Sequence, residues 1–308
     1  MNRGDQTLAI RALRSAAPYI RMYKGKTFVV KASGGVFADA ASTRVLVEQI
    51  AILHYFGVRV VLLHGGGPQL TELSGQLGLQ TRMVEGRRVT DQKSIDVTAM
   101  VLNGLINTRV LGICRDLNID AVGVSGVDAG LVRAHRRAPV KLASGELIDY
   151  GFVGDIDAVD ATVLRKLLDN GLMPVVSPLS ADAAGTLLNI NADTVAAAIG
   201  AALGAEKLIL CTGAAGILGD INDPRSLISY TDVAGLKRLR EEGRIADGML
   251  PKARAIEDAI RGGVRRVHVV SYHSTEGILG EVFTNEGTGT LIVADVNALT
   301  PAEQQSAT

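Results

Sequence analysis

Six short runs of consecutive apolar, largely β-branched residues divide this chain, and longer segments with helical spacing separate them. Because the hydrophobicity of these runs is continuous rather than alternating, they are typical of strands that are covered on both faces. The order of runs and helical segments predicts an α/β protein, a three-layer αβα sandwich with a mainly parallel central sheet. The runs lie at 27–32, 58–63, 121–124, 173–177, 207–212 and 265–271, and the helical segments lie at 42–56, 91–117, 160–171, 192–204 and 251–263.

The composition narrows the kind of function. The chain has 308 residues, of which 47% are hydrophobic, so it can bury a substantial core. Its 32 basic and 32 acidic residues cancel, so we expect no nucleic acid and no membrane surface as a partner, and any bound anion must be held by a local site. Cys114 and Cys211 fit neither a disulfide framework nor a metal-ligand spacing, which suits buried thiols in the cytoplasm. The chain has no apolar run of the roughly 18 residues that span a membrane, and no signal-peptide core.

Segments outside the alternating pattern predict peripheral elements. Residues 1–24 show apolar side chains on one helical face, and Pro18 is expected to kink this helix. Residues 131–154 predict a β-hairpin region that serves as a lid or flap. A polar, flexible tail is expected at 298–308.

Two glycine-rich turns each follow a predicted strand, "VVKASGGVF" at 29–37 and "VVLLHGGGPQL" at 60–70. Glycines before a helix let backbone N–H groups approach an anion, and the helix N-terminus adds partial positive charge. Pro68 fits a first helical turn, where its missing N–H costs nothing. One such turn could be a tight connection without a ligand. Two of them at the carboxyl edge of one sheet, beside a lysine, suggest a phosphate that passes between two anionic groups.

Five motifs then identify a family. They are "KASGG" (31–35), "HGGGPQ" (64–69), "GRRVTD" (86–91), "LNINAD" (188–193) and "DGMLPKA" (247–253). In these motifs the chain resembles the amino acid kinase family over about residues 8–293, and within it most closely the N-acetylglutamate kinases. The resemblance implies a kinase domain at 25–297, whose N-terminal half (about 25–180) binds the amino-acid substrate and whose C-terminal half (about 181–297) binds ATP. It implies ATP-dependent phosphorylation of the side-chain carboxylate of N-acetyl-L-glutamate to N-acetylglutamyl 5-phosphate, in arginine biosynthesis.

The chemistry of a carboxylate acceptor can be argued independently. A carboxylate is already ionised near neutral pH, so the reaction needs no general base. It needs alignment of two anions that repel each other, and compensation of charge on the transferring group. By resemblance, Lys31 and Lys252 stabilise the transition state, Asp193 holds both lysines, and Asn189 binds substrate. The alternative for Asp193 is a plain helix N-cap.

The other motif positions imply the remaining contacts. Arg88 matches the arginine that grips a substrate carboxylate through two parallel hydrogen bonds, whereas its neighbour Arg87 has no motif position and is expected on a solvated face. Gly66 and Gly67 would donate N–H groups to the substrate and the moving phosphate, and His64 is expected to be a scaffold residue. Magnesium is expected to arrive with ATP, bound through phosphate oxygens rather than a protein site. The residues implied on the ATP side are Gly34, Gly35, Thr212, Gly213, Gly216, Asp247, Gly248 and Met249.

The chain departs from the family pattern in two places. Ala32 and Ser33 stand where a large apolar residue and a glycine are usual, so substrate packing is expected to differ slightly. In the ATP loop "CTGAAGIL" (211–218), Gly213 stands where an acidic or amide residue usually follows the Ser/Thr. This departure puts contacts to adenine or ribose in question.

Both ends resemble arginine-inhibited members of the family. The helix at 1–24 resembles an extra helix that links dimers into a hexamer, so a homo-oligomer, hexamer or dimer, is expected; packing of the helix on its own domain is the alternative. The segment 280–293 resembles an arginine-site segment and implies that Glu281, Gly287 and Gly289 bind L-arginine as an inhibitor. Glu276 replaces the family's histidine just before it.

Other functions stay open. The regulatory domain of N-acetylglutamate synthase shares the fold and a similar beginning, "PYI…GKTFV". With this function we would expect an acetyltransferase domain to follow, where only a short tail stands here. Such a regulatory domain also commonly lacks the first lysine, which Lys31 retains. A non-catalytic amino-acid-binding protein is a further alternative, favoured mainly by Gly213. Within the kinase hypothesis, an acylated aminoadipate is the alternative acceptor.

Overall fold

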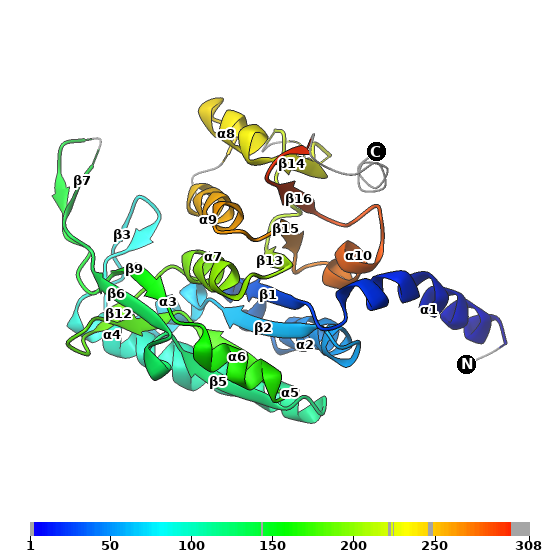
Figure 1. Ribbon diagram of the computed structural model, residues 1–308. Coiled ribbons are helices and arrows are strands. Elements are labelled where there is room, and N and C mark those ends of the chain that lie inside the picture. Colours follow the sequence, from blue (N-terminus) through cyan, green and yellow to red (C-terminus); the bar gives the residue numbers. More distant parts are fainter. Residues whose placement is uncertain (1–2, 143, 221–222, 224, 246–248, 297–308) are drawn as a thin grey trace.

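An eight-stranded sheet runs through the molecule in the order β14-β16-β15-β13-β1-β2-β10-β5. The computed structural model describes residues 3–142, 144–220, 223, 225–245 and 249–296 (Figure 1). Neighbouring strands are parallel, except that β15 and β16 are antiparallel. The six predicted strands are all present, and the mainly parallel sheet is confirmed. The strands are β1 Thr27–Ala32, β2 Arg59–His64, β5 Ala121–Ser125, β10 Met173–Ser177, β13 Lys207–Thr212, β14 Tyr230–Asp232, β15 Arg266–Ser271 and β16 Thr290–Val293.

Two hydrophobic cores lie on opposite faces of this sheet. Side chains of β1 alternate between them: Phe28 and Val30 belong to one core, and Val29 belongs to the other. The first core is covered by α2 Ala40–Tyr55, α3 Gly67–Gln76, α4 Gln92–Ala99, the π-helical segment η2 Met100–Asn107, α5 Thr108–Asp116 and α10 Gly277–Phe283. The second is covered by α6 Thr162–Asp169, α7 Ala192–Leu203, α8 Val233–Glu241 and α9 Leu250–Arg261. Helices therefore cover both faces, which confirms the three-layer αβα sandwich.

Smaller β elements extend one end of the molecule. A four-stranded sheet has the order β12-β11-β6-β9, and two hairpins, β3–β4 and β7–β8, lie next to it. Figure 1 shows the β7 hairpin projecting from the body of the protein beside β3. The β7–β8 hairpin confirms the hairpin region predicted at 131–154. The bounds are β3 Met83–Val84, β4 Arg87–Arg88, β6 Val132–Arg136, β7 Val140–Lys141, β8 Leu147–Ile148, β9 Gly154–Val159, β11 Leu179–Ala181 and β12 Leu187–Asn189, with single 3-10 turns η1 Gly34–Ala38 and η3 Asp128–Gly130 elsewhere.

The helical segment predicted at 91–117 is one long helix, Gln92–Asp116, whose middle turn is π-helical. By length and composition this is the one helix in the described part of the chain that could cross a membrane. The core helix of a globular protein passes the same test. Its Ile95, Val101 and Cys114 are buried in the first core, so we interpret it as a core helix.

The predicted N-terminal helix is α1, Arg3–Tyr23, with Pro18 inside it. Its last turn packs on the domain, where Tyr23 makes an edge contact with Phe28 at a centroid distance of 5.2 Å. Farther out, Ile10 and Leu13 are 56% and 57% exposed, and Figure 1 shows α1 leading away from the body. Only the end of the helix therefore packs on its own domain, and its outer turns carry an uncovered apolar face.

Candidate active site

The two glycine turns meet because β1 and β2 are parallel neighbours whose carboxyl ends are in register, with Ala32 opposite His64. Gly65 N donates a hydrogen bond of 2.8 Å to Ala32 O, which joins the turns directly. Their approach leaves no room for a side chain at Gly34: a Cβ there would lie 2.8 Å from Cδ of Pro68 and 2.9 Å from N of Gly67. The two predicted turns therefore lie side by side, as expected.

The second turn opens a helix with accessible backbone. α3 begins at Gly67 with Pro68 in its first turn, as predicted. Nothing lies within 4 Å of the position where a Cβ of Gly67 would stand, so this side of the backbone faces open space. A Cβ at Gly66 would instead lie 2.7 Å from Leu102 of η2. The N–H groups at the start of α3 are thus available for an anion.

Three charged side chains converge beside these turns. Lys31 at the end of β1 places Nζ 2.8 Å from Oδ1 of Asp193. Lys252 in the first turn of α9 places Nζ 3.0 Å from both carboxylate oxygens of Asp193. All three are buried. The predicted lysine–aspartate–lysine cluster is therefore assembled across α7 and α9, which lie side by side (Figure 1).

The electrostatics of this cluster fix its charge state. Burial alone would raise the pKa of Asp193, but the ammonium groups of Lys31 and Lys252 lower it to about 2. Burial, and then repulsion from Lys31, lowers the pKa of Lys252. The N-cap of α7 is Asn191, whose side chain accepts from the N–H groups of Asp193 and Thr194. The alternative interpretation of Asp193 as the helix cap is therefore wrong, and its carboxylate is free to hold the lysines.

A cavity of about 570 Å³ opens over Lys31, Asp193 and both glycine turns, whereas Lys252 lies outside its lining. Eight of the predicted site residues line it: Lys31, Gly34, Gly35, Gly66, Gly67, Arg88, Asn189 and Asp193. It is large enough for a small amino-acid derivative together with part of a nucleotide. The acceptor side of the predicted site is thus gathered around one cavity.

The predicted substrate-binding arginine points along this cavity. Arg88 on β4 donates from Nη2 to Gly67 O at 3.1 Å and to Thr71 Oγ1 at 2.7 Å, and from Nη1 to Thr81 Oγ1 at 2.9 Å. These contacts place its guanidinium beside the HGGG turn. Asn189 on β12 donates to Thr90 Oγ1 at 3.3 Å. Both side chains are held in position by neutral partners, so Arg88 keeps its positive charge for a ligand.

Further cations line the cavity. Arg87, expected on a solvated face, lines the cavity instead, and burial, followed by Arg137, lowers its pKa. Arg254 of α9 lines the opposite wall. Arg137 forms a fork with Asp155, whereas Arg87 and Arg254 form no ion pair with any residue that the structure describes. Two uncompensated arginines therefore add positive potential, a signal that the motif search missed because neither stands at a motif position.

His64 has the scaffold role that was predicted. It is fully buried, and its Nε2 lies 3.3 Å from Nδ2 of Asn107, which also donates to Val175 O at 2.9 Å. Burial lowers the pKa of His64 to about 4. The imidazole is therefore neutral near pH 7 and packs beneath the glycine turn.

The ATP-side residues are less completely gathered. Gly35 lines the cavity, whereas Thr212, Gly213, Gly216 and Met249 lie outside its lining. Gly216 packs against β16, since a Cβ there would lie 2.6 Å from Oγ1 of Thr290. Asp247 and Gly248 lie outside the described residues.

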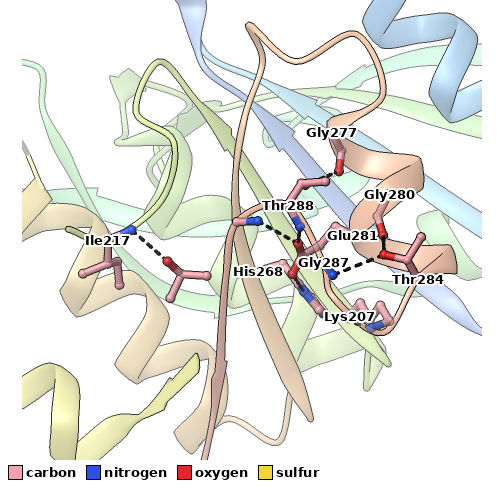
Figure 2. Close-up of polar contacts among 11 residues, drawn as sticks. Lys207, Ile217, His268, Gly277, Gly280, Glu281, Thr284, Gly287 and Thr288 are labelled. Carbon is pink, nitrogen blue, oxygen red and sulfur yellow. Dashed lines mark hydrogen bonds and ion pairs between the residues drawn. The ribbon is translucent and has the colours of Figure 1, made fainter. Parts of the chain in front are cut away.

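The three residues implied for arginine binding lie together around the buried side chain of Glu281, away from this cavity; Figure 2 shows Glu281 with Gly287 and His268. Glu281 Oε2 accepts from the backbone N–H groups of Thr288 at 2.6 Å and Gly289 at 2.9 Å, and it lies against Gly287. Its Oε1 accepts from Nδ1 of His268 at 2.7 Å. Burial opposes ionisation of Glu281, but His268 and the two N–H groups lower its pKa to about 2. The three predicted residues therefore lie together. In this structure the two glycines lie against Glu281 itself.

Sequence reasoning missed two members of this cluster. His268 Nε2 accepts from Nζ of Lys207 at 2.9 Å, and both side chains are buried. Burial lowers the pKa of Lys207 to about 7 and that of His268 to about 4. The available signal was a lysine and a histidine inside two otherwise apolar strands. A histidine therefore does stand beside Glu281, but it is His268 on β15 and not the residue at position 276.

Within the described residues, no group of three or more His, Cys, Asp or Glu side chains is arranged to hold a metal ion. The prediction that magnesium is bound through nucleotide phosphates stays a prediction.

Comparisons with known proteins identify the family. The sequence model of the amino acid kinase family matches residues 26–271. An acetylglutamate kinase of Myxococcus xanthus is 45% identical over 296 residues, covering 94% of this chain and 96% of the relative. The solved N-acetylglutamate synthase of Neisseria gonorrhoeae, complexed with coenzyme A and N-acetyl-glutamate, is 27% identical with a TM-score of 0.81 and covers 93% of this chain; the chain spans 64% of that protein. The same synthase complexed with coenzyme A and L-arginine is 26% identical with a TM-score of 0.80, covering 93% of this chain and 65% of the synthase.

Proposed function

This chain belongs to the amino acid kinase family, and from that premise we propose that it phosphorylates the side-chain carboxylate of N-acetyl-L-glutamate with ATP, in arginine biosynthesis. The products are N-acetylglutamyl 5-phosphate and ADP. The observation that carries the proposal is the buried Asp193 carboxylate, which holds Lys31 and Lys252 beside two adjoining glycine turns.

The cluster supplies charge compensation without proton transfer. A carboxylate oxygen of the acceptor bonds to the γ-phosphorus, the bond from that phosphorus to the β–γ bridging oxygen breaks, and the electron pair leaves with ADP. Negative charge gathers on the transferring group, and the ammonium groups of Lys31 and Lys252 stabilise it. Asp193 keeps these two cations close together despite their repulsion, and the acceptor needs no base because its carboxylate is already ionised.

The acceptor is held mainly by the N-terminal half of the domain, and Asn189 reaches it from the C-terminal half. The guanidinium of Arg88 grips the α-carboxylate through parallel charge-assisted hydrogen bonds, and Asn189 binds the same molecule. The N–H groups of Gly66 and Gly67 donate to the acceptor and to the moving phosphate. Arg87 and Arg254 on the cavity walls offset repulsion between the two anionic substrates.

The nucleotide is held mainly by the C-terminal half, and the first glycine turn of the N-terminal half contacts its phosphates. The first glycine turn brings backbone N–H groups close to phosphate oxygens, and Gly34 and Gly35 are closely packed against the protein, so a Cβ at either position would collide with neighbouring groups. Thr212, Gly213, Gly216 and the segment at Asp247, Gly248 and Met249 make the other contacts. Magnesium neutralises part of the phosphate charge when bound, and it is carried by the nucleotide.

An acyl phosphate is trapped by hydroxylamine, so ATP-dependent hydroxamate formation tests the proposal directly. N-acetyl-L-glutamate should be the preferred acceptor over glutamate and over acetylated or carrier-linked aminoadipate. Lys31→Ala should lose about 10²–10³ in kcat, by analogy with loss of one oxyanion donor. Lys237→Ala, an exposed lysine paired with Glu241 on α8, is the control and should keep wild-type turnover. Undiminished turnover in Lys31→Ala, or no turnover with any acceptor, would contradict the proposal.

A regulatory domain of the synthase type is the second candidate, because both solved synthase structures resemble this chain closely. The kinase is preferred because the kinase relative is much more similar and matches over almost its whole length, and because the complete lysine–aspartate–lysine cluster has no purpose in a domain that only senses an amino acid. Binding of N-acetyl-L-glutamate without ATP turnover would favour the second candidate.

Inhibition by L-arginine is proposed for the Glu281 cluster. The buried Glu281 carboxylate is a chemical partner for a guanidinium, and an incoming guanidinium would compete for it with His268 and with the backbone N–H groups of Thr288 and Gly289. The synthase relative was solved with L-arginine. Titration with L-arginine to millimolar levels should lower kinase velocity, and Glu281→Gln should weaken that inhibition. An unchanged velocity throughout the titration would refute it.

The uncovered apolar face of α1, with Ile10 and Leu13 exposed, supports assembly into a homo-oligomer, either a dimer or a hexamer. Burial of such a face is the usual reason for an amphipathic helix that projects from its domain. We place the enzyme in the cytoplasm, where ATP is available. Light scattering of the full chain and of an Ile10→Asp, Leu13→Asp variant tests the assembly.

A further inference from the structure

A tyrosine stands at the carboxyl edge of the central sheet, between the first glycine turn and the ATP loop. Tyr272 directly follows β15, and its backbone N–H donates to Thr212 O at 2.9 Å. This bond continues the parallel pairing in which Thr212 of β13 stands opposite Ser271 of β15. In open α/β sheets this edge is where ligands bind. No motif had pointed to Tyr272.

The phenol oxygen of Tyr272 reaches two glycines that the kinase proposal assigns to ATP. A Cβ at Gly35 would collide with that oxygen and lie 3.0 Å from Cζ of the same ring. A Cβ at Gly213 would lie 3.2 Å from the oxygen and 3.6 Å from Cζ. The hydroxyl therefore occupies the space that side chains at 35 and 213 would otherwise take.

This arrangement accounts for the departure noted at position 213. The family usually has an acidic or amide side chain there, and this chain has none. The phenol supplies a polar group in the same volume. Its ring packs against the first core and lies 4.5 Å from the ring of His273, so its position is fixed. Yet its hydroxyl makes no hydrogen bond to any residue in the described part of the chain, which leaves its donor available to a ligand.

We propose that Tyr272 binds the nucleotide, donating a hydrogen bond from its hydroxyl to an oxygen of ATP held over Gly35 and Gly213. The phenol replaces the polar side chain that the ATP loop lacks, and glycine at both positions leaves room for its hydroxyl. This inference rests on the kinase proposal for the identity of the nucleotide. Tyr272 is a positioning residue for ATP and takes no part in the transfer of the phosphoryl group.

The test compares variants of the full chain in the hydroxamate assay and in direct titration with Mg·ATP. Tyr272→Phe keeps the ring and removes only the hydroxyl. Loss of one hydrogen bond of ordinary strength should raise the KM and Kd for ATP about five- to tenfold, with kcat and the KM for N-acetyl-L-glutamate unchanged. Tyr55→Phe, which removes an exposed hydroxyl on α2 that donates to Leu117 O, is the matched control and should leave all these values unchanged.

An exchange of side chains sharpens the test. Gly213→Asn alone should weaken ATP binding, because the amide has no room beside the phenol. In the Tyr272→Ala background the same substitution should recover at least half of the lost affinity. An ATP Kd within twofold of wild type in Tyr272→Phe, or a Gly213→Asn effect that is the same in both backgrounds, would overturn the proposal. The titration reports on Tyr272 even if no acceptor is phosphorylated, so failure of the kinase proposal would be seen separately.

Discussion

Asp193→Asn isolates the contribution of one carboxylate to both stability and catalysis. In the native protein its oxygens lie 2.8 Å from Nζ of Lys31 and 3.0 Å from Nζ of Lys252. At an effective dielectric constant of about 20, a contact near 3 Å corresponds to about 5 kcal/mol of attraction, much of which offsets the desolvation of the ions. Because the amide is neutral and nearly isosteric, the substitution leaves two buried ammonium groups without a counter-charge.

Removing one partner of a buried ion pair costs about 3–5 kcal/mol, so we expect the free energy of unfolding of Asp193→Asn to fall by roughly that amount. Urea denaturation followed by circular dichroism measures it. The two lysines should also repel each other out of position. We therefore expect kcat to fall by about 10²–10³, or about 3–4 kcal/mol of lost transition-state stabilisation, in the hydroxamate assay at saturating substrates.

The control is Asp116→Asn, which breaks the exposed pair with Arg44. An exposed pair is worth about 0–1 kcal/mol, so this variant should match wild type in both assays. Asp193→Asn with more than a third of wild-type kcat would refute the argument that a fixed pair of lysines performs the catalysis. If kcat falls while stability is unchanged, the lysines are displaced without strain and the electrostatic calculation is wrong.

Four other variants probe the remaining parts of the structure. Arg88→Lys loses the planar fork, so the KM for N-acetyl-L-glutamate should rise about tenfold or more while the KM for ATP stays constant; an equal rise in both would contradict its assignment to the acceptor. Gly34→Ala places a methyl group 2.8 Å from Cδ of Pro68 and should lower the free energy of unfolding by about 1–3 kcal/mol. Gly67→Ala, with open space at its Cβ, should not lower it. Equal losses of stability in the two variants would show that steric overlap at position 34 is not the cause. Burial lowers the pKa of Lys207 from 10.5 to about 7, so the unfolded chain binds more protons between these values and stability should rise with pH there. Lys207→Met should flatten that rise in urea titrations at pH 7 and pH 10, and an unaltered slope would show that another group causes it.

The fold was largely predictable because its strands are buried on both faces and therefore read as continuous apolar runs. The two strands that were not predicted, β14 and β16, lie at and next to one edge of the sheet and are only 3 and 4 residues long. Such short segments carry too little periodicity to stand out from loops. The four-stranded sheet near the hairpins was not predicted, because its strands come from separate segments of the chain and only β6 lies wholly within the predicted hairpin region.

The residues of the candidate site also divide into those that the sequence predicted and those that it did not. Lys31, Asp193 and Lys252 were found because each stands in a local motif. Lys207 and His268 were not, because each looks like one polar interruption of an apolar strand, and only the packing of β13, β15 and α10 brings them together with Glu281. Tyr272 was not predicted for a further reason. Its proposed role depends on the missing side chain at Gly213, which is distant in sequence.

The join between the two halves of the domain has a consequence for how the protein can be divided. β1 and β13 are paired along five consecutive positions, from Phe28 opposite Lys207 to Ala32 opposite Cys211. This backbone pairing holds β1 and β13 next to each other at a strand spacing of about 4.8 Å. If the chain were cut between them, each fragment would carry one bare, apolar edge, which in isolation is a template for aggregation. The same two edges are complementary to each other, so this seam is the natural place to build a split enzyme whose activity reports on the reunion of its parts.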